Sequence, residues 1–321
     1  MKKKINVGIV GYGNLGKSVE KCVISSKNLN LIAIFSRREV ISPLGTKVES
    51  YYNFKNYVGR IDVMLLCGGS KSDLEIQTPE IARHFDVINT FDTHARIPAQ
   101  FRQLDKIAKA HHRRVIMSCG WDPGLFSVIR GLFYAIGKND PITFWGRGIS
   151  MGHSDAIRCV KGVKDGVQFT IPNGKAMRLA KSGELPKNIP LHFRECFVCC
   201  DPSDEKRIEK DIKSIPNYFK CQPTTVDFVD QKSVAKLKKK MSHKGQVIES
   251  FKTASGTKCN LNFSVSMASN PDFTASIMCA YVTAITNMKK AGQVGAFTNL
   301  DIPVSYLFGE DEKKKLIEHF C

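Results

Sequence analysis

Short apolar segments alternate with amphipathic ones along the first 120 residues. Ile5–Val10 is almost wholly apolar, as in a strand buried on both faces of a sheet, and Lys17–Ile24 shows helical spacing. A second apolar segment, Leu29–Phe35, follows at once. Later segments continue the pattern, with helices expected between them: Val63–Cys67, Val87–Thr90 and Val115–Cys119. The order predicts an α/β domain with a doubly wound parallel sheet of the Rossmann kind.

The regular alternation ends near residue 124, and a second domain is predicted beyond it. Its strand patterns are Phe144–Gly148, Val167–Ile171, Arg194–Cys200, Thr225–Val229 and Asn262–Met267, and its helix patterns are Glu205–Ile215 and Phe273–Ala291. Several strands with few helices between them favour an α+β domain around a mostly antiparallel sheet. We expect domains at 1–124 and 125–294, with 295–321 packing back on the first. Lys232–Lys244 is interpreted as an exposed connection.

Composition and charge mainly exclude classes of protein and kinds of partner. With 42% hydrophobic and 24% charged residues the chain is expected to be globular, and neither a bilayer span nor a signal peptide is recognisable, which predicts a cytoplasmic protein. The net charge of +18 is shared about equally by residues 1–120 and the rest. Such a diffuse excess predicts no nucleic-acid or membrane partner, although non-specific polyanion binding stays an alternative.

The eleven cysteines are also read as structural. Their odd number, without an export signal, argues against a disulfide framework. Cys196 and Cys199 form a single CxxC within a strand pattern, with no second pair to complete a zinc site, so no metal is predicted.

A nucleotide fingerprint joins the first strand to the first helix. Gly11-Tyr12-Gly13-Asn14-Leu15-Gly16 lies between them, where glycines permit a tight turn, close approach to a pyrophosphate and close helix packing. The second strand ends in Ser36-Arg37-Arg38, where an NAD enzyme would place an acid. A hydroxyl and two guanidiniums suit a 2′-phosphate, which favours NADP, the alternative being an exposed turn. Later strands end in Gly68-Gly69-Ser70, Phe91-Asp92-Thr93-His94 and Gly120–Gly124, loops expected along the dinucleotide.

Further segments carry a resemblance over nearly the whole chain. They are Val10–Gly16, Ile34–Arg38, Gly120–Gly124, Thr143–Gly146, Gly152–Ala156, Asn270–Ser276 and Gly295–Thr298. In this order the chain resembles meso-diaminopimelate dehydrogenase. The resemblance implies NADP-dependent oxidative deamination of the D-centre of meso-2,6-diaminopimelate to L-2-amino-6-oxopimelate (tetrahydrodipicolinate) and ammonia, the reverse reductive amination, a place in lysine biosynthesis, and a homodimer formed by the second domain.

The resemblance also implies the site residues. Cofactor contacts fall on Gly11, Tyr12, Gly13, Asn14, Leu15, Gly16, Ser36, Arg37, Arg38, Cys67, Gly68, Gly69, Ser70, Thr90, Phe91, Asp92, Cys119, Gly120, Trp121, Asp122 and Pro123. Substrate contacts fall on Asp92, Asp122, Trp145, Met151, Gly152, Thr170, Arg194, His243 and Asn270. Members of the family often have Gln at the position of Met151, which leaves the contacts at the distal end of the substrate open.

The residue types suit this substrate, which carries two carboxylates and two ammonium groups. Arg194 can bind a carboxylate through two nitrogens, and Thr170 and His243 can add hydrogen bonds. Asp92 and Asp122 can hold an amino group, accept its proton and activate water for the resulting imine, with Asp122 the first choice.

Each assignment has a structural alternative. Asp122 suits a turn or a helix cap, Trp145 a core aromatic, His243 a solvated side chain and Arg194 a surface ion pair. Competing functions are a related amino-acid or semialdehyde dehydrogenase, in which Cys119 would be the nucleophile, and a non-catalytic NADP-binding protein.

Overall fold

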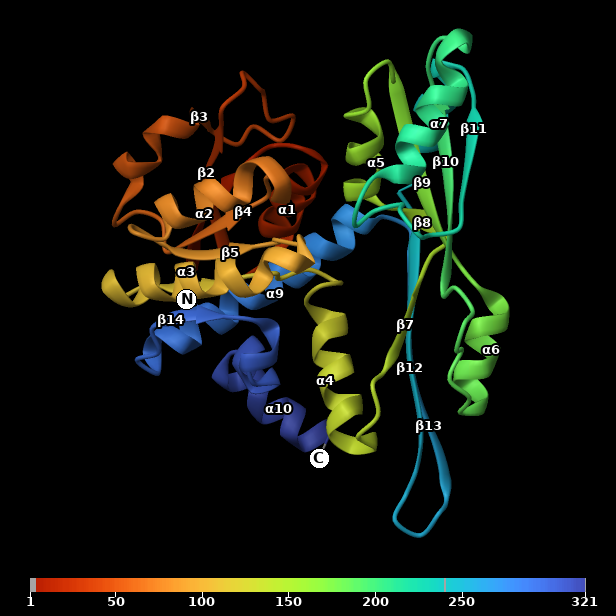
Figure 1. The fold of residues 1–321 in the computed structure, drawn as a ribbon. Coiled ribbons are helices and arrows are strands. Elements are labelled where there is room, and N and C mark those ends of the chain that lie inside the picture. Colours follow the sequence, from red (N-terminus) through yellow and green to blue (C-terminus); the bar gives the residue numbers. More distant parts are fainter. Residues whose placement is uncertain (1–3, 240, 321) are drawn as a thin grey trace. The chain divides into compact units, whose positions relative to one another are not determined.

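The computed structural model describes residues 4–239 and 241–320, which form two compact units (Figure 1). One unit comprises Met1–Val128 and Pro271–Cys321, and the other comprises Ile129–Asn270. The helix α9 (Asn270–Lys290) therefore lies almost wholly in the first unit, whereas the sequence interpretation extended the second domain to residue 294. The reason is packing, because Met278, Val282 and Ile285 of α9 are buried in the core beside the parallel sheet.

A seven-stranded sheet, parallel throughout, forms the centre of the first unit. Its strands run in the order β14-β6-β5-β4-β1-β2-β3. Their bounds are β1 (Ile5–Val10), β2 (Leu29–Ser36), β3 (Val48–Ser50), β4 (Val63–Leu66), β5 (Asp86–Asn89), β6 (Arg114–Ile116) and β14 (Gly295–Phe297). The order reverses at β1, so the carboxyl ends of β1 and its neighbours mark the ligand-binding edge of such a sheet. The predicted Rossmann fold is confirmed. The strand β14 brings the chain after residue 294 back to this sheet, where it pairs with β6.

Helices cover both faces of this sheet. They are α1 (Asn14–Ser25), α2 (Glu75–Ile81), α3 (Ile97–Ala110) and α9, while α4 (Leu125–Gly137) crosses the boundary between the units and α10 (Glu310–Phe320) ends the described chain. Alternate strand residues enter two separate cores. On β4, Val63 and Leu65 pack in the core that contains α1 and α9, whereas Met64 and Leu66 pack in the core that contains α2 and α3. Burial on both faces explains why these strands are apolar at every position.

Two smaller sheets, mostly antiparallel, form the second unit, as predicted. A four-stranded sheet has the order β11-β10-β9-β8, with only β10 and β11 parallel, and a three-stranded sheet has the order β13-β12-β7. Their bounds are β7 (Ile142–Trp145), β8 (Gly148–Ile149), β9 (Asp165–Pro172), β10 (His192–Cys199), β11 (Thr224–Phe228), β12 (His243–Lys252) and β13 (Lys258–Met267). In Figure 1 the β12–β13 hairpin is a long two-stranded ribbon with α6 beside it.

The helices of the second unit cover these sheets. They are α5 (Met151–Arg158), α6 (Gly174–Ser182), α7 (Glu205–Ser214) and α8 (Gln231–Lys238). The prediction of an exposed connection over Lys232–Lys244 is wrong. That segment contains most of α8, whose Val234 is fully buried against Val167 and Phe169, and the start of β12. Lys240 lies outside the described residues. The lysines of α8 surround one buried position, which a count of charges does not reveal.

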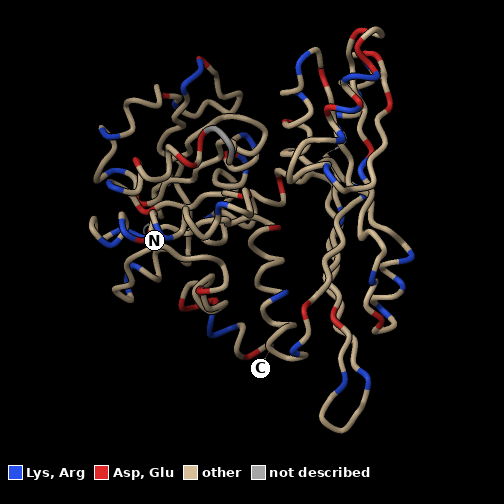
Figure 2. Tube along the Cα trace, viewed as in Figure 1, with Lys and Arg blue, Asp and Glu red and all other residues tan. Residues whose placement is uncertain are grey.

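Basic residues lie along elements of both units rather than in one of them (Figure 2). Within the described residues, each helix is either too short or too polar to cross a bilayer. The same residues contain no group of three or more His, Cys, Asp and Glu side chains arranged for a metal ion.

Candidate functional site

The three glycines of the fingerprint have three different environments. Gly11 has φ +91°, a left-handed conformation that favours glycine, and it allows the chain to turn directly after β1. A side chain at Gly16 would begin 2.1 Å from the carbonyl oxygen of Gly11, so α1 packs against the loop only because that side chain is missing. A Cβ at Gly13 would meet nothing within 4 Å. The open side of Gly13, at the start of α1, therefore fits the close approach of a pyrophosphate.

The loop after β2 is ordered by its own side chains. The Ser36 hydroxyl accepts a hydrogen bond from the backbone N–H of Arg38 at 3.1 Å. Arg37 forms an ion pair with Asp73, whose second carboxylate oxygen accepts the N–H of Gly69 at 3.1 Å. Asp73 thus connects Arg37 to the glycine pair that follows β4. The sequence interpretation missed this carboxylate, because nothing local to Asp73 shows that it faces an arginine 36 positions earlier in the chain.

Asn89 holds the two loops that carry the candidate aspartates. It is fully buried at the end of β5, and its side-chain oxygen accepts the N–H groups of Phe91 and Ser118, both at 3.1 Å. Its amide nitrogen donates to Thr78, and its backbone oxygen accepts the N–H of Cys119 at 2.8 Å. The loops after β5 and β6 are therefore joined at one amide. Polar residues at strand ends signal such a role, but the sequence interpretation did not select Asn89.

Asp92 and Asp122 lie in these two loops of the first unit. The backbone N–H of Asp92 donates to the Ser70 hydroxyl at 3.0 Å, which connects the loops after β4 and β5. Asp122 lies in a compact loop in which the N–H of Gly120 donates to the Pro123 carbonyl at 3.0 Å. Trp121 is buried beside it and makes an edge contact with Phe126.

Cys119 is unsuited to nucleophilic chemistry. Its side chain is fully buried, and burial raises the pKa of the thiol to about 12. A reactive cysteine needs a lowered pKa and access to substrate, and Cys119 has neither. The backbone at Cys119 still lies at the carboxyl end of β6, where the cofactor-contact assignment places it.

The second unit brings together most of the predicted substrate residues. Thr170 on β9 is directly opposite Arg194 on β10 and opposite Gly148 on β8. The guanidinium of Arg194 donates to the Thr170 hydroxyl at 2.9 Å. His243, which is 4% exposed, lies so close to Gly148 that a Cβ there would be 2.2 Å from its ring. Its Nδ1 donates to the backbone oxygen of Lys244 at 2.8 Å, which leaves Nε2 as an acceptor in the neutral ring. The solvated-histidine alternative for His243 is thereby excluded.

Arg194 is not the surface ion pair that the sequence left open. Its Nε is buried and has no hydrogen-bond partner among the described residues. Burial lowers the pKa of Arg194 because the charged guanidinium is less stable away from water. A carboxylate is the group that would satisfy this guanidinium, because it is flat, anionic and accepts through two oxygens.

Two histidines near Arg194 are kept neutral. Burial, together with the charge of Arg194, lowers the pKa of His192 and that of His153 to about 4 each. His192 accepts the backbone N–H of Trp145 at 2.8 Å and stacks on its indole, with ring centroids 4.9 Å apart. Trp145 is therefore held in place by an imidazole and is not an isolated core aromatic. The sequence interpretation missed His192, although it precedes Arg194 by two positions on one strand and so shares its face.

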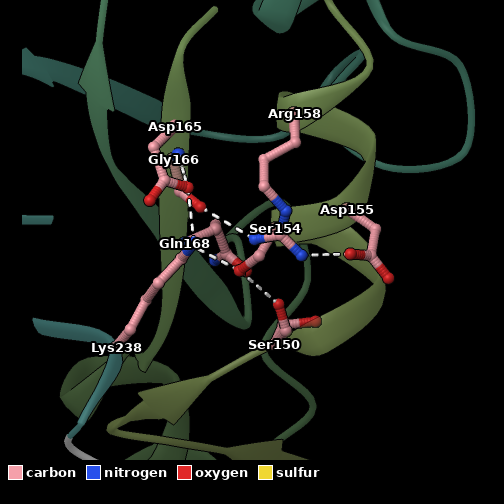
Figure 3. A network of polar contacts seen from close by, with 8 residues as sticks. All are labelled: Ser150, Ser154, Asp155, Arg158, Asp165, Gly166, Gln168 and Lys238. Atoms are coloured by element: carbon pink, nitrogen blue, oxygen red, sulfur yellow. Dashed lines mark hydrogen bonds and ion pairs between the residues drawn. The ribbon is translucent and has the colours of Figure 1, made fainter. Parts of the chain in front are cut away.

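The start of α5 is fastened to β9 by the network shown in Figure 3. Ser154 donates to the Ser150 carbonyl at 2.7 Å and accepts the N–H of Gln168 at 3.0 Å. This fixes the turn that begins with Met151, which is 48% exposed, and Gly152, whose Cβ would be 3.8 Å from Tyr218. Asn270 begins α9, and its N–H donates to the carbonyl of Met241 at 2.9 Å.

Three comparisons with known proteins agree with one another. Residues 120–269 match the family model described as diaminopimelic acid dehydrogenase C-terminal domain. The meso-diaminopimelate D-dehydrogenase of Ureibacillus thermosphaericus is 42% identical over 98% of this chain and 99% of its own length. The structure of the C. glutamicum DAP dehydrogenase in complex with DAP superposes with a TM-score of 0.95 at 37% identity, covering 99% of this chain and all of the other. An engineered D-amino acid dehydrogenase bound to NADP+ gives 0.91 at 35% identity, with the same coverage.

Proposed function

The chain belongs to the meso-diaminopimelate D-dehydrogenase family, and from this premise we propose that it deaminates the D-centre of meso-2,6-diaminopimelate with NADP. The products are L-2-amino-6-oxopimelate, which cyclises to tetrahydrodipicolinate, and ammonia; reductive amination is the reverse reaction. The observation that carries the proposal is the pairing of Arg194 with Thr170, because a guanidinium whose buried Nε has no hydrogen-bond partner among the described residues needs an anionic partner.

The loops of the first unit bind NADP, which when bound accepts a hydride from the D-centre carbon. Gly13 leaves room for the pyrophosphate, Gly11 and Gly16 allow the turn and the helix packing around it, and the loop after β2 supplies Arg37 and Arg38 for the 2′-phosphate. Asp92 and Asp122 do the proton chemistry. Each can hold the ammonium group, one accepts a proton so that the amine is neutral, and Asp122 then activates the water that hydrolyses the imine.

The second unit binds the part of the substrate that does not react. Arg194 and Thr170 hold a carboxylate, and Nε2 of His243 accepts a hydrogen bond from the ammonium group beside that carboxylate. Because His153 and His192 are neutral, the charge next to this carboxylate comes from Arg194. Trp145, stacked on His192, forms an apolar wall for the methylene chain. Met151 begins α5 without the amide that many relatives have there, so it sets the contacts at the distal end.

Burial of Cys119 argues against the semialdehyde-dehydrogenase alternative, because that chemistry needs a reactive thiolate. A cytoplasmic location is also part of the proposal. The ten cysteines that the structure describes are free thiols, as expected in a reducing compartment.

A homodimer completes the proposal. The sequence of α4 is apolar almost all round, yet Leu132, Tyr134 and Ile136 are each about half exposed in the single chain. A helix of this kind is normally buried, so a second copy is its expected cover. Light scattering should give twice the chain mass, and Leu132→Glu with Ile136→Glu should give the monomer mass. A monomeric wild-type protein would refute this part.

The reaction is tested by following NADPH formation at alkaline pH with the separated meso, LL and DD isomers of diaminopimelate, using NADP or NAD. Ammonia is measured in parallel. Turnover of the meso isomer with NADP, and one ammonia for each NADPH, is the expected result. A protein that binds NADP but turns over no isomer would contradict the proposed substrate.

A further inference from the structure

A buried carboxylate in the first unit has no part in the assignments above. Glu20 lies in the second turn of α1 and is 1% exposed. The Tyr12 hydroxyl donates to one of its oxygens, and the Ser42 hydroxyl donates to the other. Both donors are themselves buried, at 4% and 6% exposure. Buried carboxylates normally face an arginine or lysine, so acceptance from two hydroxyls is an unusual use of such a costly group.

The two hydroxyls come from two different cofactor loops. Tyr12 lies between Gly11 and Gly13 in the glycine-rich loop. Ser42 lies between β2 and β3, four residues beyond Arg38, and its oxygen accepts the N–H groups of Leu44 at 3.1 Å and Thr46 at 3.3 Å. Ser42 therefore organises the loop that follows the arginines. One carboxylate joins the loop for the pyrophosphate to the loop for the 2′-phosphate.

We propose that Glu20 is a positioning residue for NADP, holding the glycine-rich loop and the loop after Arg38 at a fixed separation. The inference rests on the NADP specificity of the proposed function, but not on its substrate. Preorganisation of this kind strengthens binding because the free protein already has the conformation that the cofactor requires. Burial, and the hydrogen bond to Glu20, raise the pKa of Tyr12, so its hydroxyl stays protonated and able to donate.

Glu20→Gln is the sharpest perturbation, because it changes one oxygen to an NH2 group. An amide oxygen can still accept one hydroxyl, but the NH2 group can only donate. The Ser42 oxygen already accepts two N–H groups and has no free lone pair for a third donor. An amide whose oxygen accepts from Ser42 can reach Tyr12 only by donating to its oxygen, so the Tyr12 hydroxyl hydrogen loses its acceptor. Both hydrogen bonds also lose the carboxylate charge, and the separation of the two loops is held less firmly.

The test is equilibrium binding of NADP and of NAD to the full-length protein, without substrate. Glu20→Gln should raise the Kd for NADP about tenfold, the scale of one hydrogen bond to a charged group, and should lower the preference for NADP over NAD. Tyr12→Phe removes only the hydrogen bond between Glu20 and the glycine-rich loop, and it should raise the Kd for NADP and the Kd for NAD by the same factor. Ser42→Ala removes only the hydrogen bond between Glu20 and the loop after Arg38, and it should raise the Kd for NADP more than the Kd for NAD.

Tyr57→Phe is the matched control, since the buried Tyr57 donates to a different carboxylate of the same unit, Glu49, at 2.8 Å. It should lower the melting temperature without changing either Kd. The proposal is overturned if Glu20→Gln lowers the melting temperature but leaves both dissociation constants at their wild-type values. It is also overturned if Ser42→Ala weakens NADP equally in the wild-type and Glu20→Gln backgrounds, because coupling through Glu20 requires a smaller effect in the second. Failure to turn over diaminopimelate, with these Kd changes present, would refute the substrate alone.

Discussion

Gly148→Ala should weaken substrate binding by displacing His243, without replacing any residue assigned to substrate. The added Cβ would be 2.2 Å from Cδ2, 2.3 Å from Cγ and 2.7 Å from Nε2 of the His243 ring. Carbon atoms in contact prefer about 3.5–4.0 Å, so the ring must move by more than about 1 Å. Because Cγ is the base of the ring, rotation about the ring axis does not relieve the clash.

The Gly148→Ala substitution should lower both the free energy of unfolding and the affinity for diaminopimelate. Displacing the ring lengthens its 2.8 Å hydrogen bond to Lys244, and overpacking of this kind typically destabilises by about 1–3 kcal/mol. Loss of the hydrogen bond that Nε2 accepts from the charged ammonium group, at about 1.5–3 kcal/mol, corresponds to a rise of about tenfold to a hundredfold in KM for diaminopimelate. The Kd for NADP should not change, because the cofactor loops belong to the first unit. A change confined to KM identifies binding that is equal in the ground and transition states.

Steady-state kinetics with the meso isomer, together with equilibrium titration of NADP, measure these quantities. Gly174→Ala is the control, since its Cβ would meet only the end of the Arg178 side chain, at 3.7 Å. Unchanged KM in Gly148→Ala, with the protein folded, would show that His243 does not contact the substrate. A parallel loss of NADP affinity would show instead that the variant damages the whole protein.

Other substitutions test the remaining assignments. Asp122→Asn removes the proton acceptor, so turnover should fall by about a hundredfold or more while NADP still binds; unchanged turnover would exclude Asp122 from the chemistry. Arg37→Asp should weaken NADP more than NAD in binding titrations, and equal losses would contradict the 2′-phosphate assignment. The pKa values of His153 and His192 are about 4 in the folded protein and near 6.5 when unfolded, so the unfolded chain binds more protons between these values. The free energy of unfolding should therefore fall by roughly 2 kcal/mol per histidine from pH 7 to pH 5, as measured by urea titration, and His192→Gln should reduce that slope. A slope that is the same in the variant would mean that His192 titrates normally.

The sequence was most informative where structure depends on neighbours in the chain. Ile5–Val10, the glycines at 11, 13 and 16, and the segment Leu29–Phe35 specify strand, turn and packing locally, and the structure has the same elements. The α9 helix was recognised as a helix but assigned to the other domain. Its apolar spacing shows that one face is buried, but not which sheet covers it.

The candidate site was likewise predictable only where it depends on residues that are close together in the chain. Thr170 and Arg194 become neighbours because β9 and β10 pair in one register, which no pattern within either strand fixes. Asn89, Asp73 and His192 were missed for a related reason. Each acts by accepting hydrogen bonds or charge from residues distant in the chain, and an isolated polar residue gives no sign of such partners.

The position of α9 in the chain also affects how the protein folds during synthesis. The first 128 residues contain six of the seven strands of the parallel sheet, but not α9 or β14. Ala275, Met278, Val282 and Ile285 of α9 pack in the same core as Val19 of α1 and Val7 of β1. A nascent chain that ends before residue 271 therefore exposes one apolar face of its sheet to water. The first unit can therefore complete its core only after the whole second unit has been synthesised. A gene fragment cut after residue 128 should yield an aggregation-prone product and not a free-standing nucleotide-binding domain.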